Sequence, residues 1–331
     1  MPYQSTVFNT DSEIKRSFSQ LNVVSLFSGC GGLDLGFEKA GFNILWANEY
    51  DKDIWETYRH NHQNTFLDTR SITEIPSEEV PECDGIIGGP PCQSWSEGGS
   101  KRGLNDKRGQ LFWDYIRILN AKSPKFFVAE NVKGMLMNRY GNALDDFKKA
   151  FSAAGEFGYD LYFFLVNAAD YDVPEDRERV LFIGFRKDLH VNYRLPAPTS
   201  PAGKRITLRQ AIGDLAKKEP KGFESVVNTK NDWNTEIPNH DYLVGGFSSI
   251  FLSRNRVRSW DEMSYTIQAS GRQCPLHPQA PKMRKINENK HVFIEGQEHL
   301  YRRFSVREVA RIQTFPDDFI LRYNIYPQDT R

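Results

Sequence analysis

The stretch from residue 21 to residue 32, LNVVSLFSGCGG, joins an apolar run to a cluster of glycines. Residues 21–27 are typical of a buried β-strand, and residues 33–37, LDLGF, predict the start of a helix. Glycines let a backbone turn sharply and approach a ligand closely. The order strand, glycine loop, helix favours a nucleotide-binding crossover, although a purely structural tight turn is an equal alternative for the loop taken alone.

Working outward from this stretch, apolar runs alternate with helical patterns as far as residue 186. Such an alternation predicts an α/β fold with a doubly wound, mostly parallel sheet covered by helices on both faces. Strands are predicted at 42–49, 85–89, 125–131 and 179–185, with a shorter one ending at Asp68, and helices at 51–61, 111–121 and 143–155.

The character of the chain changes after residue 195. The connector 195–204, LPAPTSPAGK, is rich in turn formers, and the following hundred residues mix aromatics and arginines without a sustained period. Residues 304–313 are helical in pattern, with Ser305 as N-cap and Glu308 completing a capping box. We therefore expect a polar extension (1–20), a catalytic domain (21–195), a smaller irregular second domain (196–300) and a return segment to the first domain (301–331).

The composition excludes several classes of protein. Lys+Arg and Asp+Glu are equal at 43 each in 331 residues, so a nucleic-acid enzyme of this composition must concentrate positive charge on one face. The 4 cysteines match neither a zinc pattern nor a disulfide framework, so no metal site is expected. No apolar run approaches the length of a membrane span, and residues 1–17 lack a signal-peptide core. These features favour a cytoplasmic protein with reduced thiols.

The stretch 85–96, GIIGGPPCQSWS, presents a cysteine at the end of a strand. The two prolines remove backbone donors and fix φ, so the loop is stiff. A free cysteine is usually a small buried hydrophobe, and a polar, proline-stiffened loop is an unusual place for one. Because open α/β sheets bind ligands at the carboxyl ends of their strands, Cys92 is the candidate nucleophile.

Polar residues follow three other predicted strands. Glu49 lies 17 residues beyond Gly32, where a carboxylate can accept hydrogen bonds from ribose hydroxyls. Asp68 could hold an adenine amino group, or be a solvated loop acid. Glu130 and Asn131 end the strand 125–131, and Asn131 could also be a helix N-cap.

Together these motifs resemble the C5-cytosine DNA methyltransferases. The resemblance runs from Leu21 to Phe319 and is closest to bacterial GGCC-specific restriction-modification enzymes. It rests on FSGCGG (27–32), PPCQ (90–93), ENV (130–132), DYDVP (170–174) followed by RER (177–179), RFSVRE (303–308) and QTFP (313–316).

The resemblance implies a methyl transfer from S-adenosylmethionine to carbon 5 of cytosine in double-stranded DNA. Cys92 would add to carbon 6 of the ring, Glu130 would act on ring nitrogen N3, and Arg177 and Arg179 would supply positive charge, unless these arginines are a surface pair. The residues expected at the cofactor are Phe27, Gly29, Gly31, Gly32, Leu33, Glu49, Tyr50, Asp68 and Pro90.

The target base would be rotated out of the helix, as methyltransferases require. The loop 94–109 would close over DNA, with Ser94 and Arg102 contacting it, or be a disordered surface loop. In the second domain, SRNRVR (253–258) and ASGRQC (269–274) carry the resemblance to GGCC-specific enzymes. Arginine forks match the two acceptors of guanine, and the expected DNA readers are Arg254, Arg256, Arg258 and Arg272.

The chain departs from the family pattern in two ways. Residues 320–331 do not resemble the Gly-Asn-x-Val-Pro segment that normally follows and walls the cofactor pocket. A truncated reading frame, a partial chain or a second polypeptide that supplies this segment would each account for the difference; otherwise a monomer is expected. The second departure is Glu175, where the family more often has glutamine.

Three rival functions remain open: an RNA cytosine methyltransferase, a non-catalytic DNA-binding fragment, and another nucleotide-binding α/β protein such as a dehydrogenase. The last has no use for Pro-Pro-Cys, and its glycine spacing fits poorly.

Overall fold

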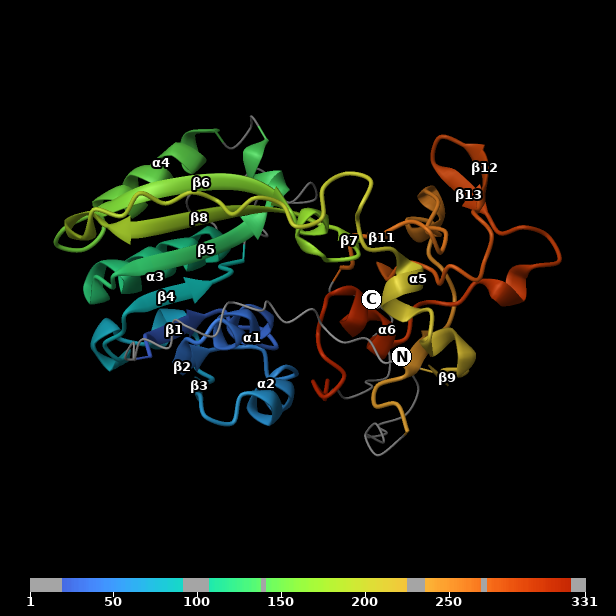
Figure 1. Ribbon diagram of the computed structural model, residues 1–331, viewed down its shortest axis with the longest axis horizontal. Coiled ribbons are helices and arrows are strands. Elements are labelled where there is room, and N and C mark those ends of the chain that lie inside the picture. Colours follow the sequence, from blue (N-terminus) through green and yellow to red (C-terminus); the bar gives the residue numbers. More distant parts are fainter. Residues whose placement is uncertain (1–19, 92–106, 138–140, 225–235, 269–272, 323–331) are drawn as a thin grey trace.

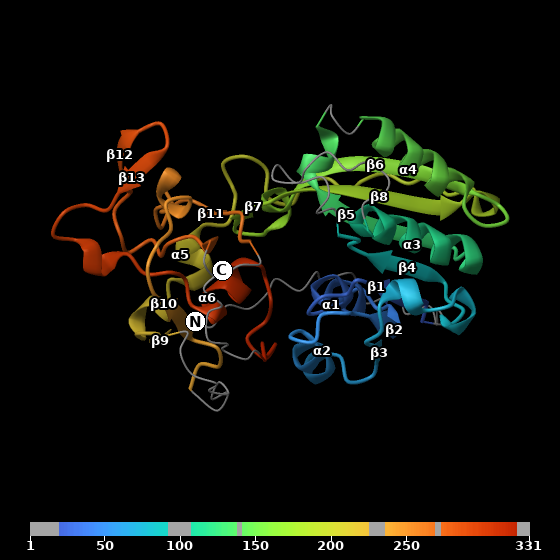
Figure 2. The same ribbon diagram turned by 180° about the vertical axis from the view of Figure 1, so that it is seen from behind.

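The computed structural model describes residues 20–91, 107–137, 141–224, 236–268 and 273–322. Within these ranges the chain forms two units that lie beside each other in both views (Figures 1 and 2). The first unit is built around one large sheet, and the second holds short strands and helices joined by irregular segments.

The large sheet contains seven described strands in the order β3-β2-β1-β4-β5-β8-β6. Every neighbouring pair from β3 to β5 is parallel, whereas β8 is antiparallel to both β5 and β6. The predicted mostly parallel α/β sheet is thus confirmed. The strands are β1 (Asn22–Leu26), β2 (Asn43–Asn48), β3 (Phe66–Asp68), β4 (Gly85–Gly88), β5 (Phe126–Val132), β6 (Tyr159–Asn167) and β8 (Glu178–Arg186).

Adjacent apolar residues in the central strands explain why both faces of the sheet are covered. Successive side chains of a strand point to opposite faces, so the pairs Val23-Val24, Ile86-Ile87 and Phe126-Phe127 each supply one residue to either side. Val24, Ile86 and Phe127 belong to a hydrophobic cluster that includes residues of α3 and α4. Val23, Ile87 and Phe126 belong to a second cluster, on the other face, that includes residues of α1. Continuous apolar runs of this kind are typical of parallel strands buried on both faces.

Four helices belong to this unit: α1 (Gly32–Lys39), α2 (Trp55–Asn61), α3 (Lys107–Lys122) and α4 (Gly141–Ala153). In Figure 1, α3 and α4 lie along the β5-β8-β6 half of the sheet, and α1 and α2 lie near β1 to β3. None of the described helices is long and apolar enough to cross a membrane.

Strand β6 was not predicted, although its sequence YDLYFFLVN is rich in aromatic and aliphatic residues. It pairs with β8 along its whole length, from Tyr159 opposite Arg186 to Asn167 opposite Glu178. Such residues fit a pleated, half-buried surface, so strand propensity was the signal that could have found it.

The second unit contains α5 (Leu208–Ile212), α6 (Val306–Ile312) and short strands. The two-residue strands β7 (Glu175–Asp176) and β11 (Ser264–Tyr265) pair with each other and join the two units. The other short strands are β9 (Lys221–Glu224), β10 (Asp241–Val244), β12 (Arg284–Asn287) and β13 (Lys290–Val292). β9 pairs with β10 in parallel, and β12 forms a hairpin with β13.

Helix α6 begins as the sequence predicts. Ser305 accepts from the backbone N–H of Glu308, and the Glu308 carboxylate accepts from the backbone N–H of Ser305, which confirms the capping box. However, Phe304 and Ile312 pack with α5 in a core of the second unit. We therefore place the return to the first unit after α6 rather than at residue 301, because residues 320 and 322 are the ones that hydrogen-bond to α2.

A buried ionic cluster holds α6 in the second unit. Glu308 is fully buried, accepts hydrogen bonds of 2.8 Å from both terminal nitrogens of Arg302, and lies 3.4 Å from Nε2 of His277. Burial opposes ionisation of Glu308, but the hydrogen bonds from Arg302 and His277 hold its pKa well below the usual range. Burial also lowers the pKa of His277.

These shifts make stability depend on pH. A carboxylate whose pKa falls on folding stabilises the folded state above its ordinary pKa of 4.5, and that contribution is lost as the pH falls below it. Protonation of His277 at low pH acts in the same direction. We expect the free energy of unfolding, measured in urea by circular dichroism, to decrease steadily as the pH is lowered from 5.

At neutral pH, Glu308→Ala should cost roughly 3–5 kcal/mol, because Arg302 is left buried without its partner. Asp261→Asn is the control, since it breaks the exposed ion pair with Arg209 and should change the free energy of unfolding far less. Equal stability of the two variants would contradict this account.

Candidate active site

Two of the residues expected to carry the chemistry, Glu130 and Arg179, meet at one edge of the large sheet. Parallel strands β1, β2, β4 and β5 bring their carboxyl ends to this edge, where open α/β sheets place their ligands. Strand β8 runs the other way, so its first residues arrive at the same edge, with Arg179 opposite Val132 at the end of β5. Antiparallel β8 thus brings the guanidinium of Arg179 to the carboxylate of Glu130 in β5.

The glycine loop between β1 and α1 turns through left-handed backbone conformations. Phe27 has a φ of 55°, Gly29 of 57° and Gly31 of 85°. A left-handed conformation is strained for a phenylalanine, and such strain is concentrated at functional sites. A side chain on Gly29 would meet nothing within 4 Å, so a ligand has room to approach the backbone there.

Glu49, at the end of β2, closes this loop. Its carboxylate accepts from the backbone N–H of Gly29 and from that of Asp51, both at 2.8 Å. The next residue, Tyr50, is 71% exposed. Free acceptor positions on Glu49 and an exposed aromatic ring beside a glycine loop fit the ribose and base of a nucleoside.

Asp68, at the end of β3, is already partnered. It accepts from the backbone and side chain of Arg70, with the shortest contact 2.7 Å from Nη2 to Oδ2. Burial opposes ionisation, but the hydrogen bonds from Arg70 lower the pKa of Asp68. An adenine amino group could use only the acceptor positions that Arg70 leaves free.

Glu130, Asn131 and Arg179 form the polar centre of the edge. The Arg179 Nε lies 2.6 Å from Oε1 of Glu130. Asn131 Nδ2 donates to the carbonyl oxygen of Pro90 at 3.0 Å, and its Oδ1 accepts from the N–H of Val132. The amide of Asn131 therefore ties the loop after β4 to the end of β5, rather than capping an α-helix.

A family model described as "C-5 cytosine-specific DNA methylase" matches residues 21–330. The chain belongs to this family. It is 55% identical over 304 residues to the Type II methyltransferase M.FnuDI of Fusobacterium nucleatum, and the matched region covers 92% of this chain and 86% of that relative. It is 53% identical over 309 residues to M.NgoPII of Neisseria gonorrhoeae, which covers 93% and 89%.

Two solved structures share the fold. One is an E. coli protein described as a prophage-encoded DNA modification methyltransferase, with a TM-score of 0.68, 23% identity, and coverage of 93% of this chain and 92% of that one. The other is a DNMT2 variant of Spodoptera frugiperda, with a TM-score of 0.58, 20% identity, and coverage of 91% and 90%. Family and relatives identify the activity as that of a DNA (cytosine-5)-methyltransferase, as the sequence predicted.

Among the cysteines of the methyltransferase, three are described and all are poor nucleophiles. Burial raises the pKa of Cys30, and it raises the pKa of Cys83 and of Cys274 to about 12. The predicted nucleophile, Cys92, lies outside the described residues, directly after Pro91.

Arg177 is held by a residue whose role the sequence did not reveal. Its Nη1 lies 3.4 Å from both the Glu175 carboxylate and the carbonyl oxygen of Ile267. Glu175 is fully buried and also accepts from the N–H of Ile267 and from Gln313. The carboxylate of Glu175 thus joins β7 to the second unit, a role that was not predicted from the sequence.

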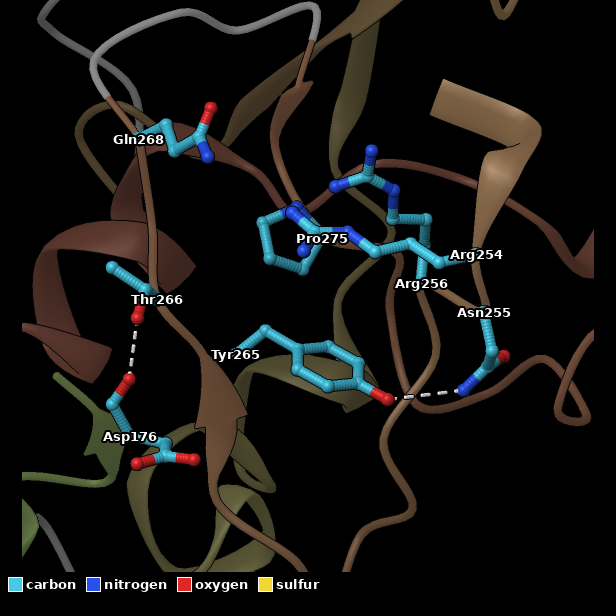
Figure 3. A pocket seen from close by; sticks show the side chains of 8 residues that line it. All are labelled: Asp176, Arg254, Asn255, Arg256, Tyr265, Thr266, Gln268 and Pro275. Atoms are coloured by element: carbon cyan, nitrogen blue, oxygen red, sulfur yellow. Dashed lines mark hydrogen bonds between the residues drawn. The ribbon is translucent and has the colours of Figure 1, made fainter. Parts of the chain in front are cut away.

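A pocket of about 310 Å³ lies in the second unit (Figure 3). Its lining combines two guanidinium groups with amides and one carboxylate. The residues are Asp176, Arg254, Asn255, Arg256, Tyr265, Thr266, Gln268 and Pro275.

The arginines predicted to contact DNA differ in their exposure and in the partners that their side chains already have. Arg254 is exposed. Arg256 is buried and donates to the carbonyl oxygens of Phe251 and Ile250. Arg258 lies over the Tyr265 ring at 4.1 Å and pairs with Glu262 at 3.3 Å. Ser94, Arg102 and Arg272 lie outside the described residues.

The bond between Asn131 and Pro90 yields a test. Asn131→Ala should lower the rate of methyl transfer to DNA by about 10²-fold, because a loop displaced by about 1 Å misaligns the reacting groups. Methyl transfer is measured with a radiolabelled methyl donor at saturating concentrations. The control is Asn43→Ala, which removes an amide hydrogen bond to Asn22 at the opposite edge of the sheet. A wild-type rate in Asn131→Ala would contradict the assignment.

Proposed function

We propose that this methyltransferase takes the methyl group of S-adenosylmethionine and places it on carbon 5 of cytosine within GGCC in double-stranded DNA, through a covalent adduct with Cys92. We further propose that it is the modification enzyme of a restriction-modification system; two of its relatives are named Type II methyltransferases. One observation carries the mechanism: Asn131 fixes Pro90, two residues before Cys92, beside the ion pair of Glu130 and Arg179.

The glycine loop fits the proposed cofactor. The open side of Gly29, the half-buried carboxylate of Glu49 and the exposed ring of Tyr50 suit the backbone contacts, ribose and adenine of a nucleoside. The cofactor supplies an electrophilic methyl group on a sulfonium. The other residues proposed to contact it are Phe27, Gly31, Gly32, Leu33, Asp68 and Pro90.

The protein groups then act on the pyrimidine. The electron pair of the Cys92 thiolate would form the bond to carbon 6, and the displaced π electrons of the ring would make carbon 5 nucleophilic. Carbon 5 would then bond to the methyl carbon as the bond from that carbon to the sulfonium sulfur breaks, with the bonding pair staying on sulfur as a neutral thioether. A proton shared between Glu130 and ring nitrogen N3 stabilises the negative charge that addition of the thiolate places on the ring. Loss of the carbon 5 proton to a base or water then breaks the bond between sulfur and carbon 6 and returns the thiolate. Arg177 and Arg179 supply the positive charge that favours the thiolate.

The second unit offers the contacts that DNA needs. A stacked base cannot reach the sheet edge, so the target nucleotide is rotated out of the helix. The exposed guanidinium of Arg254 suits the acceptors of a guanine or a phosphate. The hairpin of β12 and β13 exposes Arg284, Lys285 and Lys290, which suit the DNA backbone.

The covalent step is tested with DNA that carries 5-fluorocytosine at the target. Fluorine cannot leave as a cation, so the bond between sulfur and carbon 6 persists. We expect a protein–DNA species that survives denaturing electrophoresis for the wild type and for Cys83→Ser, but none for Cys92→Ser. Trapping by Cys92→Ser would show that another residue is the nucleophile.

The DNA surface is tested by Arg254→Ala. Loss of a base contact should cost roughly 1–3 kcal/mol of binding free energy and relax the sequence preference, whereas loss of a phosphate contact should reduce the salt dependence by about one ion. Fluorescence anisotropy with GGCC and scrambled duplexes at several salt concentrations measures both. Arg209→Ala is the control, because Arg209 is an exposed arginine that pairs with Asp261. If both variants bind like the wild type, Arg254 does not contact DNA.

A further inference from the structure

Two glycines of the cofactor loop are closed in by side chains of distant segments. A Cβ on Gly31 would lie 2.0 Å from Nε2 of His62, and a Cβ on Gly32 would lie 3.0 Å from Cζ of Phe315. Gly29, in contrast, faces open space. The loop therefore has a free side and a side pressed against protein, and Phe315 is the contact that comes from beyond the second unit.

The rings behind the loop form a continuous chain of ring contacts, which we call the aromatic bracket (Tyr58, His62, Phe315 and Phe319). The ring centroids lie 4.7 Å apart for Phe315 and Phe319, 6.0 Å for Phe319 and His62, and 4.5 Å for His62 and Tyr58. Tyr58 in turn donates to the buried carboxylate of Asp34 in α1 at 2.6 Å. The bracket thus touches both the loop and the helix that follows it.

The far end of the bracket is fixed to the second unit. Arg307 of α6 is completely buried, and its guanidinium donates to the carbonyl oxygens of Pro316 and Phe319 at 3.1 and 3.0 Å. On the other side, Asn61 and Thr57 of α2 hold the backbone of Ile320 and Arg322 through reciprocal hydrogen bonds. Phe315 and Phe319 therefore have little freedom to move away from the loop.

The backbone before Phe315 is strained in the direction of this contact. Thr314 has a φ of 64°, a left-handed conformation that is strained for a β-branched residue. The turn is closed by a hydrogen bond of 2.9 Å from the N–H of Phe315 to the carbonyl oxygen of Ala310. Backbone strain that the surrounding structure maintains is concentrated at functional sites. The strain at Thr314 therefore points to a function for the neighbouring side chain of Phe315, which contacts Gly32.

We propose that Phe315 is a positioning residue for the cofactor loop. Its ring supports Gly32 from behind and sets the conformation in which the loop binds the cofactor, so that cofactor affinity depends on the segment leaving α6. This role rests on the proposed function, because it assumes that the loop binds S-adenosylmethionine. Phe315 acts through Gly32 and touches none of the reacting atoms.

A size-exchange experiment tests the contact. Binding of S-adenosylhomocysteine without DNA is measured by isothermal titration calorimetry for Gly32→Ala, Phe315→Leu and the double variant. Gly32 has no positive φ, so alanine strains only the contact with the ring. We expect Gly32→Ala to weaken binding by about tenfold or more, Phe315→Leu to weaken it less, and the double variant to recover most of the loss, because leucine lacks the ring tip.

Gly36→Ala is the matched control, since a Cβ there would meet nothing within 4 Å: it should bind like the wild type, and combined with Phe315→Leu it should bind like Phe315→Leu alone. If Gly32→Ala is too unstable to purify, Phe315→Ala decides: it should raise the KM for S-adenosylmethionine several-fold while leaving kcat and DNA affinity near wild type.

The outcomes are distinguishable. A wild type that does not bind S-adenosylhomocysteine overturns the proposed cofactor site, and the role of Phe315 with it. A wild type that binds, together with a double variant as weak as Gly32→Ala or an unchanged KM in Phe315→Ala, overturns the role of Phe315 alone.

Discussion

The hydrogen bond from Asn131 to the carbonyl oxygen of Pro90 is the interaction on which the catalytic centre depends. It joins the ends of two neighbouring parallel strands, β4 before the proposed nucleophile and β5 with the proposed acid Glu130. It extends the contact between β4 and β5, which pair as far as Gly88 and Ala129, into the start of the Pro-Pro-Cys loop. The fold supplies the other requirement, because antiparallel β8 brings Arg179 to the same edge as the carboxyl ends of β4 and β5.

Buried polar groups help to tie the two units together. Glu175 links β7 to Ile267 and Gln313, and Arg307 satisfies carbonyl oxygens along the segment that returns to α2. A buried charge costs free energy unless all its partners are present, so each such group penalises any other arrangement of the segments it joins. The geometry of the site is thus set in part by groups that never meet a substrate.

The features that could be predicted from the sequence are those that depend on residues close together in the chain. The strand and glycine loop at 21–32, the strand ends at Glu49 and Glu130, and the capping box of Ser305 and Glu308 all depend on residues close together in the chain. Strand β6 was missed although its residues favour a strand. The partners of Asp68 and Arg256 could not be predicted, since an arginine that satisfies backbone carbonyls and one that faces DNA look the same in a sequence. The burial of Glu175 depends on contacts with residues about 90 and 138 positions away.

The central claim is that the sulfur of Cys92 bonds to the target pyrimidine while Glu130 engages the ring from the side of β5. The most direct measurement is a crystal structure of the protein trapped on a fluorinated duplex. The account predicts continuous density between Sγ of Cys92 and carbon 6 of an extruded cytosine, with the Glu130 carboxyl group within hydrogen-bond distance of N3. A base that remains stacked, or a ring held far from Glu130, would contradict it.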